Sequence, residues 1–566
     1  MTNDKDLLFT ALGGIGEIGM NAYLYGLDGD WLMVDLGVSF ADDRLPGVDL
    51  VLPDIGFIEE QKGRLRGLLI THAHEDHLGA VPYLWPRLGC PIYCTRFAAA
   101  ILRRKLEEAG VGSPATINVV EPGATIDLAP FSCRFLHVSH SIPEANAIAI
   151  ETRLGRVLHT GDWKLDPAPL VGTTTDVDGL EAFGAEGVLA MVADSTNVLS
   201  PGTSGSEAEV RDSLKDLIKA QPNRVVLTTF ASNIARLETA IVAGRAAGRE
   251  IVMVGRSMHR MIDAAKEAGY LKDLPPLVDE RDAMSLPRHK ALFLVTGSQG
   301  EPRAALQRIA SGQHPRVRIE AGDTAIFSSK IIPGNERTLY DLHNRLVDRG
   351  VEVITEEDHF VHVSGHPSRD EMASLYRWIR PTYAVPMHGE ARHLHAHARF
   401  AEENGAKQAF VLQNGDLLRL APGEPAIVGD VPTGRIAVEN EDFVDAGDEL
   451  FRTRRRLMNH GILTAAVALD PYGSLLAAPS VRSFGALDLG SFGNLSTEVE
   501  GAVESAIEDM DDKEVLNDGR VEHAVRGAIR QALALPRMKR PLIEVQVMRL
   551  SPESARGLEE ERLGAA

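Results

Sequence analysis

Three histidines and one aspartate fall within six consecutive positions of this chain. They are His72, His74, Asp76 and His77, in the segment THAHEDH at residues 71–77. Neutral imidazoles and a carboxylate are ligands that suit zinc at neutral pH. A polar turn without function is the alternative, but local propensity gives little reason for so dense a cluster. Four ligands cannot complete two metal sites, so the segment predicts further ligands elsewhere in the chain.

The elements on either side of the cluster should bring its side chains together. The apolar run at residues 65–70 predicts a strand that ends at Thr71. The pattern at residues 78–88 predicts a helix, which should begin near Asp76. The tight turn between the two would hold all four candidate ligands in one small volume.

Several later predicted strands also end on histidine or aspartate. His140 follows a predicted strand, and a predicted hairpin ends on Asp162, where a carboxylate could bridge two metals. Three more predicted strands end on Asp194, on His366 and on His388. One such residue alone is ordinary turn chemistry, but the series after the first cluster predicts additional site residues.

Composition limits the protein class. A chain of 566 residues should form about three or four domains. Its 44% hydrophobic and 25% charged residues are typical of a globular protein, and no apolar run reaches the roughly 18 residues that span a membrane. The polar first residues lack a signal-peptide core, and three cysteines fit a reducing compartment, so we expect a cytoplasmic protein without a membrane partner.

The net charge of −21 argues mildly against a polyanionic substrate. It disfavours a protein that coats nucleic acid through a general basic surface. A locally basic cleft, or metal ions that meet phosphates, would remain compatible with this charge. The basic run at residues 452–456 could contact RNA, although a solvated or interface face is the plainer interpretation.

From about residue 206, predicted helices and strands alternate, which indicates a parallel α/β domain. Small polar residues follow each strand there, for example Ala231, Ser232 and Asn233. Ligands of such sheets bind beyond the carboxyl ends of the strands, and the amides at helix starts favour anions. We therefore expect this domain to bind phosphates. Residues 462–469, 474–481 and 542–550 predict strands, and residues 498–510 and 521–535 predict helices, of a small last domain.

The order of these motifs resembles the metallo-β-lactamase superfamily, and the inserted α/β domain narrows the likeness to the β-CASP nucleases. The greatest likeness is to the bacterial ribonuclease J family, over about residues 7–550. The matching segments are residues 16–21 (GEIGMN), 71–77 (THAHEDH), 159–164 (HTGDWK), 193–197 (ADSTN), 296–302 (TGSQGEP), 362–366 (HVSGH) and 386–390 (PMHGE).

This resemblance implies a metallo-β-lactamase αββα sandwich with an inserted parallel α/β β-CASP domain and a small α/β C-terminal domain. The implied boundaries are residues 1–206 and 359–430 for the two parts of the sandwich and 207–358 for the insertion. A linker at residues 431–457 and a C-terminal domain at residues 458–566 would follow.

The resemblance also implies how two zinc ions per subunit are bound, with Mn²⁺ or Mg²⁺ as possible replacements in activity. One metal would take His72, His74 and His140, the other Asp76, His77 and His388, and Asp162 would bridge them. Asp35 would orient ligand histidines. Asp194, His366 and His388 match three further β-CASP motifs, and histidine at the third is typical of members that act on RNA. Some relatives hold a structural calcium, which would correspond here to Gly47, Asp49 and Asp445.

The implied activity is two-metal hydrolysis of RNA phosphodiesters. It would be a 5′-to-3′ exonuclease that prefers 5′-monophosphate ends and also cuts internally, in mRNA decay and rRNA maturation. His366 would protonate the leaving oxygen, with Asp194 and Asp76 also in the catalytic set. Single-stranded RNA is the expected partner, and a homodimer or homotetramer the expected assembly. The implied substrate-binding residues are Ala231, Ser232, Asn233, His362, Val363, Ser364, Gly365 and His366.

Four alternatives remain open at this point. A DNA-directed β-CASP nuclease would use the same metal ligands. A small-molecule hydrolase of the lactamase or glyoxalase kind would not need the inserted domain, and a scaffolding paralogue should have lost ligands. An oxidoreductase of the flavodiiron type needs a glutamate in the first motif, where this chain has a histidine.

Overall fold

The computed structural model describes residues 5–111, 116–332, 334–440, 442–486, 495–534 and 540–551. The chain divides into two compact units. Met1–Phe40 with Leu50–Ile436 form the first, and Ala41–Asp49 with Ala437–Ala566 form the second. None of the helices within these described ranges has both the length and the apolar character that crossing a bilayer requires.

Two β-sheets pack face to face in the first unit. Their inner faces share one apolar core that includes Phe9, Tyr25, Phe135, Ile148 and Val385. The first sheet, in the order β24-β23-β1-β3-β4-β7-β8-β9, contains β1 (Leu7–Gly13), β3 (Ala22–Leu27), β4 (Asp30–Val34), β7 (Leu65–Leu69), β8 (Ile92–Cys94), β9 (Ile117–Val119), β23 (Asp416–Ala421) and β24 (Ala426–Asp430). The second, in the order β10-β11-β12-β13-β14-β20-β22, contains β10 (Thr125–Leu128), β11 (Phe131–His137), β12 (Asn146–Thr152), β13 (Gly155–His159), β14 (Ala190–Asp194), β20 (Tyr383–Met387) and β22 (Gln408–Ala409).

Helices cover the outer faces of both sheets, which confirms the predicted αββα sandwich. On the second sheet a separate apolar core joins Phe183, Tyr376 and Phe400 to the strands. These three residues belong to α5 (Val177–Ala185), α11 (Arg369–Ile379) and α12 (Ala391–Glu403). On the first sheet, α4 (Arg96–Glu108) contacts β9 and α3 (Val81–Leu88).

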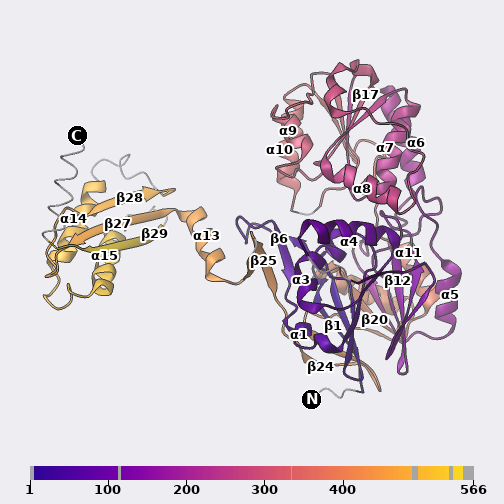
Figure 1. The fold of residues 1–566 in the computed structure, drawn as a ribbon, viewed down its shortest axis with the longest axis horizontal. Helices are drawn as coiled ribbons and strands as arrows, with labels where there is room; N and C mark the ends of the chain where they lie inside the picture. The colour runs from indigo at the N-terminus through magenta and orange to yellow at the C-terminus, as the bar shows by residue number, and fades with distance from the viewer. Residues whose placement is uncertain are drawn as a thin grey trace. The chain divides into compact units, whose positions relative to one another are not determined.

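The inserted domain is a parallel five-stranded sheet in the order β16-β17-β15-β18-β19, as predicted. Figure 1 shows α6 and α7 on one side of this sheet and α9 and α10 on the other. Because all strands run the same way, the loops after their carboxyl ends share one edge. The strands are β15 (Val225–Thr228), β16 (Glu250–Val254), β17 (Ala291–Val295), β18 (Thr324–Phe327) and β19 (Glu352–Ile354), and the helices α6 (Glu207–Ala220), α7 (Ile234–Ala246), α8 (Arg256–Glu267), α9 (Ala305–Ala310) and α10 (Glu336–Val347).

The second unit holds a three-stranded sheet in the order β28-β27-β29, packed against two helices through a core of its own. It contains α13 (Glu449–His460), β27 (Ile462–Leu469), β28 (Ser480–Phe484), α14 (Leu495–Glu508), α15 (Asp518–Ala532) and β29 (Leu542–Arg549). The small α/β domain was thus predicted, but the strand expected at residues 474–481 lies at β28 instead. Leu535, the predicted end of the last helix, lies outside the described residues.

Three local predictions near the site are wrong. The strand before the histidine cluster ends at Leu69, and the predicted helix is split into α2 (Glu75–Leu78) and α3. Residues 360–366 form no strand but an irregular segment. Its backbone carbonyls accept hydrogen bonds from side chains and not from a neighbouring strand. Arg236 Nη1 and Ser328 Oγ donate to the Val361 carbonyl at 3.0 and 2.7 Å, and Asn197 Nδ2 donates to the His366 carbonyl at 3.0 Å.

Candidate metal centre

The predicted ligands meet at one end of the sandwich because the strands that carry them end there. β13, β14 and β20 are parallel neighbours, so Asp162, Asp194 and His388, at or just after their carboxyl ends, lie side by side. β7 from the facing sheet delivers His72 and the turn that follows it. Two converging groups of possible ligands result. One contains His72, His74, His140 and Asp162, and the other Asp76, His77, Asp162 and His388.

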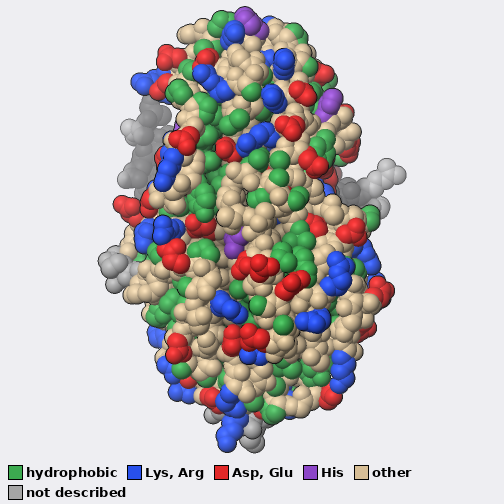
Figure 2. Space-filling model, turned by 90° about the vertical axis from the view of Figure 1, so that its right-hand side faces the viewer, with side chains coloured by type: hydrophobic (Ala, Val, Ile, Leu, Met, Phe, Trp, Pro, Cys, Tyr) green, Lys and Arg blue, Asp and Glu red, His purple; other side chains and the backbone are tan. Residues whose placement is uncertain are grey.

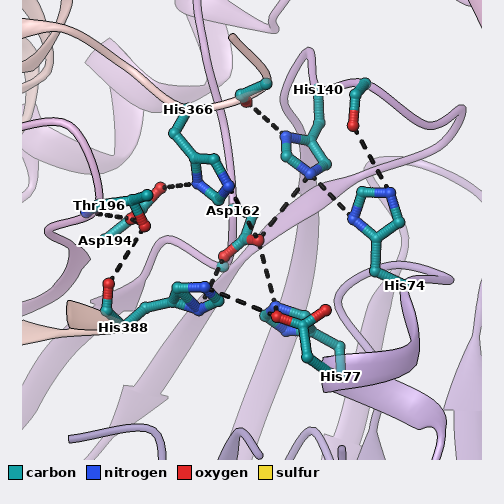
Figure 3. Close-up of polar contacts among 12 residues, drawn as sticks. His74, His77, His140, Asp162, Asp194, Thr196, His366 and His388 are labelled. Carbon is teal, nitrogen blue, oxygen red and sulfur yellow. Dashed lines mark hydrogen bonds and ion pairs between the residues drawn. The ribbon is translucent and has the colours of Figure 1, made fainter. Parts of the chain in front are cut away.

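In the first group, three imidazole nitrogens lie close together, and Figure 3 shows two of these rings, His74 and His140, turned toward each other. His74 Nδ1 lies 3.0 Å from His72 Nε2 and 3.1 Å from His140 Nε2. Burial lowers the pKa of His72 and of His140 well below the usual value, and that of His74 to about 4. His140 Nδ1 lies 2.5 Å from the Gly365 carbonyl and must donate to it, so its Nε2 presents a lone pair. Neutral rings with converging lone pairs form a cation site.

The second group shares Asp162 with the first. Asp76 Oδ2 lies 3.6 Å from both His77 Nε2 and His388 Nε2. Asp162 Oδ2 lies 3.2 Å from His77 Nε2 and 3.8 Å from both His72 Nε2 and His140 Nε2. One carboxylate oxygen therefore faces both groups, which is the position a bridging ligand needs.

The donor set fits two divalent cations. Ligand atoms about 2.0–2.1 Å from a tetrahedral zinc lie about 3.3 Å from one another, close to the separations within each group. Asp162 is only 2% exposed, and its Oδ1 accepts no hydrogen bond from any described residue. Burial raises the pKa of Asp162, but His388, His77 and His366 outweigh it and hold that pKa well below the usual value. A buried, ionised and under-bonded carboxylate between histidines is what a cation would satisfy.

Two buried residues orient the ligands of the second group. Asp35 Oδ2 lies 2.7 Å from His77 Nδ1, so the structure places Asp35 next to a predicted ligand. Asn21 was not predicted. Its Nδ2 donates to the Asp76 carbonyl at 2.9 Å, and its Oδ1 lies 3.1 Å from His388 Nδ1. The matching segment at residues 16–21 ends on this asparagine, but spacing alone gave no reason to place it near a histidine more than 300 residues away.

His366 and Asp194 form a pair at the edge of the centre (Figure 3). His366 Nδ1 lies 2.8 Å from Asp194 Oδ2, and Thr196 donates to Asp194 Oδ1 through its N–H and its hydroxyl. His366 Nε2 points toward Asp162 Oδ2, at 3.9 Å. Burial opposes protonation of His366, but the charges of Asp194 and Asp162 raise its pKa to about 9. The ring therefore carries two N–H groups at neutral pH.

The predicted substrate-binding residues line two loops, but they do not all offer free groups. Ser364 Oγ accepts from Asn197 Nδ2 at 2.7 Å, and the buried Val363 side chain packs against Gly205. Asn233 is the N-cap of α7, and its backbone N–H bonds to the Phe230 carbonyl. Asn233 thus caps α7, and its contact with phosphate stays a prediction.

The predicted calcium residues belong to the second unit. Asp445 Oδ1 accepts from the Gly447 N–H at 2.6 Å, and Arg454 Nη1 donates to the Pro46 carbonyl next to Gly47. Among the described residues, neither Asp49 nor Asp445 belongs to a group of side chains that could hold a metal ion. A guanidinium beside Gly47 disfavours a cation, and the calcium site stays a prediction.

Four family models match successive parts of the chain. They are the metallo-beta-lactamase superfamily at residues 15–228, the ribonuclease J beta-CASP domain at residues 222–346, the Zn-dependent metallo-hydrolase RNA specificity domain at residues 334–412, and the ribonuclease J C-terminal domain at residues 450–550.

Whole-chain comparisons agree with these matches. Ribonuclease J from Sinorhizobium meliloti is 41% identical over 97% of this chain and 98% of its own length. Ribonuclease J from Corynebacterium glutamicum is 40% identical over 84% of this chain and 67% of its own length. A solved structure of a protein of unknown function from Enterococcus faecalis V583 covers 73% of this chain and 99% of its own, with a TM-score of 0.50 and 16% identity, a likeness of fold alone. The chain belongs to the ribonuclease J family.

Proposed function

We propose that this chain hydrolyses RNA phosphodiesters at a two-zinc centre. It would remove nucleotides in the 5′-to-3′ direction from 5′-monophosphate ends and also cut internally, in mRNA decay and rRNA maturation. Membership of the ribonuclease J family supports the coarser statement that the chain is a metal-dependent ribonuclease. The observation that carries the finer proposal is the shared position of Asp162 Oδ2 between two groups of histidines.

Seven residues would hold the metals in this proposal. His72, His74 and His140 would bind one cation, Asp76, His77 and His388 the other, and Asp162 both. Zinc is preferred because five of the seven donors are imidazoles, which suit zinc better than magnesium or calcium. Two bound cations of this kind would activate water at neutral pH and neutralise charge that develops on the phosphate.

His366 would supply the proton that the leaving 3′-oxygen needs. The ring is charged at neutral pH, Asp194 holds its Nδ1–H, and its Nε2 faces Asp162. A general acid must lie within hydrogen-bond reach of the reacting oxygen, and a phosphate bound beside Asp162 would meet this condition. Asp194 would keep the ring oriented and favour its protonated form.

RNA would be held locally rather than by a broad basic face. In Figure 2, Lys and Arg side chains alternate with Asp and Glu over the visible face. Near the centre, burial and the charges of Arg236, Lys330 and Lys164 lower the pKa of His362. Two of these cations are paired with carboxylates, Arg236 with Glu207 and Lys164 with Asp166. We infer that Lys330, the exposed member of this group, binds the RNA phosphates together with the N–H groups of Ala231 and Ser232 before α7.

The test compares wild type with Asp162→Ala and His77→Ala for bound zinc and for decay of end-labelled single-stranded RNA. We expect two zinc ions in the wild type, fewer in each variant, and loss of RNA decay in both. Metal-free protein that keeps full activity would remove the mechanism. Reloading with Mn²⁺ or Mg²⁺ asks which ions support activity, and DNA of the same sequence tests the RNA preference.

The choice of RNA end tests the direction of cleavage. We expect RNA with a 5′-monophosphate to release mononucleotides faster than RNA with a 5′-triphosphate or a 5′-hydroxyl. Equal rates without mononucleotide products would leave only an endonuclease.

We also propose that the chain forms a homodimer or homotetramer through its second unit. Phe484 and Met548 lie on the face of the β28-β27-β29 sheet that its helices leave open, and are 57% and 38% exposed. Sedimentation equilibrium of the wild type and of Phe484→Ser tests this, since a monomeric wild type would contradict it.

A further inference from the structure

One arginine in the inserted domain is completely buried beside the predicted phosphate-binding loops. Arg236 is the third residue of α7, and its relative exposure is 0%. Its Nε and Nη2 donate to Glu207 Oε2 and Oε1, both at 3.0 Å. Glu207 is the first residue of α6, so this fork-shaped pair fastens the starts of two helices to each other.

The remaining guanidinium nitrogen of Arg236 reaches two other segments. Nη1 donates to the Ser328 carbonyl at 3.0 Å and to Ser328 Oγ at 2.7 Å, just beyond β18. It also donates to the Val361 carbonyl at 3.0 Å, and Ser328 Oγ donates to that same carbonyl at 2.7 Å. Arg236 therefore fixes the point at which the chain enters residues 361–366, here called the return loop.

The far end of the return loop is fixed by the metal centre. His140 Nδ1 donates to the Gly365 carbonyl at 2.5 Å, and Asn197 Nδ2 donates to Ser364 Oγ and to the His366 carbonyl. The loop thus spans from the inserted domain to the metal ligands, with an anchor at each end. The anchor at the metal end involves a ligand itself, whereas the Arg236 anchor does not touch the centre.

We propose that Arg236, oriented by Glu207, is a positioning residue that sets the return loop at the distance from the metal centre that RNA phosphates require. Arg236 acts through the Val361 carbonyl and does not contact RNA. The inference rests on the proposed ribonuclease function and deepens it. It assigns the placement of RNA relative to the metal centre to a residue that contacts neither.

The experiment compares Arg236→Met with Arg224→Met in the full chain. Arg224 is a matched control, because it is also buried and pairs at 3.0 Å with Asp323, which immediately precedes β18 of the same domain. Arg224 itself immediately precedes β15, at the opposite end of the strand from the loops. Each variant is assayed on 5′-monophosphate RNA and on bis(p-nitrophenyl) phosphate, and bound metal is counted. This small diester needs the metal centre but is too short to use phosphate contacts along the return loop.

We expect Arg236→Met to lower kcat/KM on RNA by about 100-fold, mostly through a higher KM, because misplaced binding groups have effects of this size. Its metal content and its rate on the small diester should stay near those of the wild type. Arg224→Met should lower thermal stability without changing KM for RNA. Arg236→Lys should fall between Arg236→Met and wild type, since lysine keeps the charge but not the planar fork.

Three outcomes would overturn the inference. They are equal losses on RNA and on the small diester in Arg236→Met, an RNA-specific loss in Arg224→Met, or a wild-type KM in Arg236→Lys. If Arg236→Met does not fold, Glu207→Gln replaces it, because it keeps the shape of the pair and removes one charge, and a wild-type KM there would also overturn the inference. A wild type inactive on RNA would instead contradict the proposed function.

Discussion

His77 Nδ1 lies 2.7 Å from Asp35 Oδ2, and both residues are almost completely buried beneath the metal centre. Asp35 also accepts from the N–H and the hydroxyl of Thr71, both at 2.8 Å. Thr71 therefore fixes the orientation of the Asp35 carboxylate, which in turn fixes the His77 ring. With Nδ1 held in this way, His77 Nε2 is turned toward Asp162 Oδ2, at 3.2 Å, and toward Asn21 Nδ2, at 3.0 Å.

Asp35→Asn should weaken metal binding by about 10–100-fold, the usual effect of removing a hydrogen-bonded partner of a ligand histidine. The amide keeps the size of the side chain but gives the imidazole a weaker acceptor. Competition against a zinc-responsive dye measures the affinity. Asp323→Asn, an equally buried carboxylate in the inserted domain, is the control, and an unchanged affinity in Asp35→Asn would contradict the orienting role.

His366→Gln should lower kcat on RNA by about 100- to 10,000-fold without loss of metal, as expected for removal of a general acid. Asp194→Asn should act in the same direction, because it leaves His366 Nδ1 without its carboxylate partner. The small diester should be less affected, since its nitrophenolate leaves without a proton. Loss of a bound metal in His366→Gln would show that the residue is a ligand instead.

Lys330→Ala should raise KM for RNA and reduce its dependence on salt. Lys330 is exposed after the carboxyl end of β18, in the loop that Arg236 fastens through Ser328. Removing one phosphate contact lowers the slope of log affinity against log salt by about 0.7 for a single strand. Lys219→Ala, an exposed lysine at the end of α6, is the control. Identical slopes in both variants and the wild type would exclude Lys330 from the RNA path.

His397 should make the fold sensitive to mild acid. It is fully buried between Ser195 Oγ and the Tyr376 hydroxyl, each at 2.9 Å, and burial lowers its pKa from 6.5 to about 4. Between these values the unfolded chain binds a proton that the folded chain does not, so stability falls as the pH is lowered. The loss approaches about 3 kcal/mol near pH 4.

The test of this effect is His397→Gln, which stays neutral at every pH. Thermal midpoints of both proteins at pH 7.5 and pH 5 should fall more for the wild type than for the variant. A parallel fall would mean that His397 does not determine the acid sensitivity.

Local patterns in the sequence predicted the inserted α/β domain and the candidate ligands at strand ends, because each depends on short-range features. The αββα sandwich and the grouping of the ligands came from the family resemblance. His72 to His77 are neighbours in the chain, and Asp162 and His388 mark the ends of apolar strands, which periodicity detects. The return loop escaped this reasoning. Val361 and Val363 alternate with polar residues as in a strand, yet buried side chains from distant segments bind the backbone.

The supporting residues could not be found in this way either. Asn21 meets His388 across 367 positions, and Arg236 meets Val361 across 125. Their side chains are ordinary in their local setting, since Arg236 lies in a helix and Asn21 in a turn before β3. Asn21 and Arg236 find these partners only when the chain is folded.

The Gly365 carbonyl that holds His140 belongs to the main chain, so no exchange of side chains can delete it. A Cβ at Gly365 would lie 2.9 Å from the His140 ring, which leaves glycine as the residue that fits there. The stretch of backbone that we propose binds the transcript thus also orients His140, a candidate metal ligand. A transcript that moves Gly365, at the end of the return loop away from Arg236, should change the affinity for the ion. By thermodynamic linkage, removal of the ion should then change the affinity for transcripts.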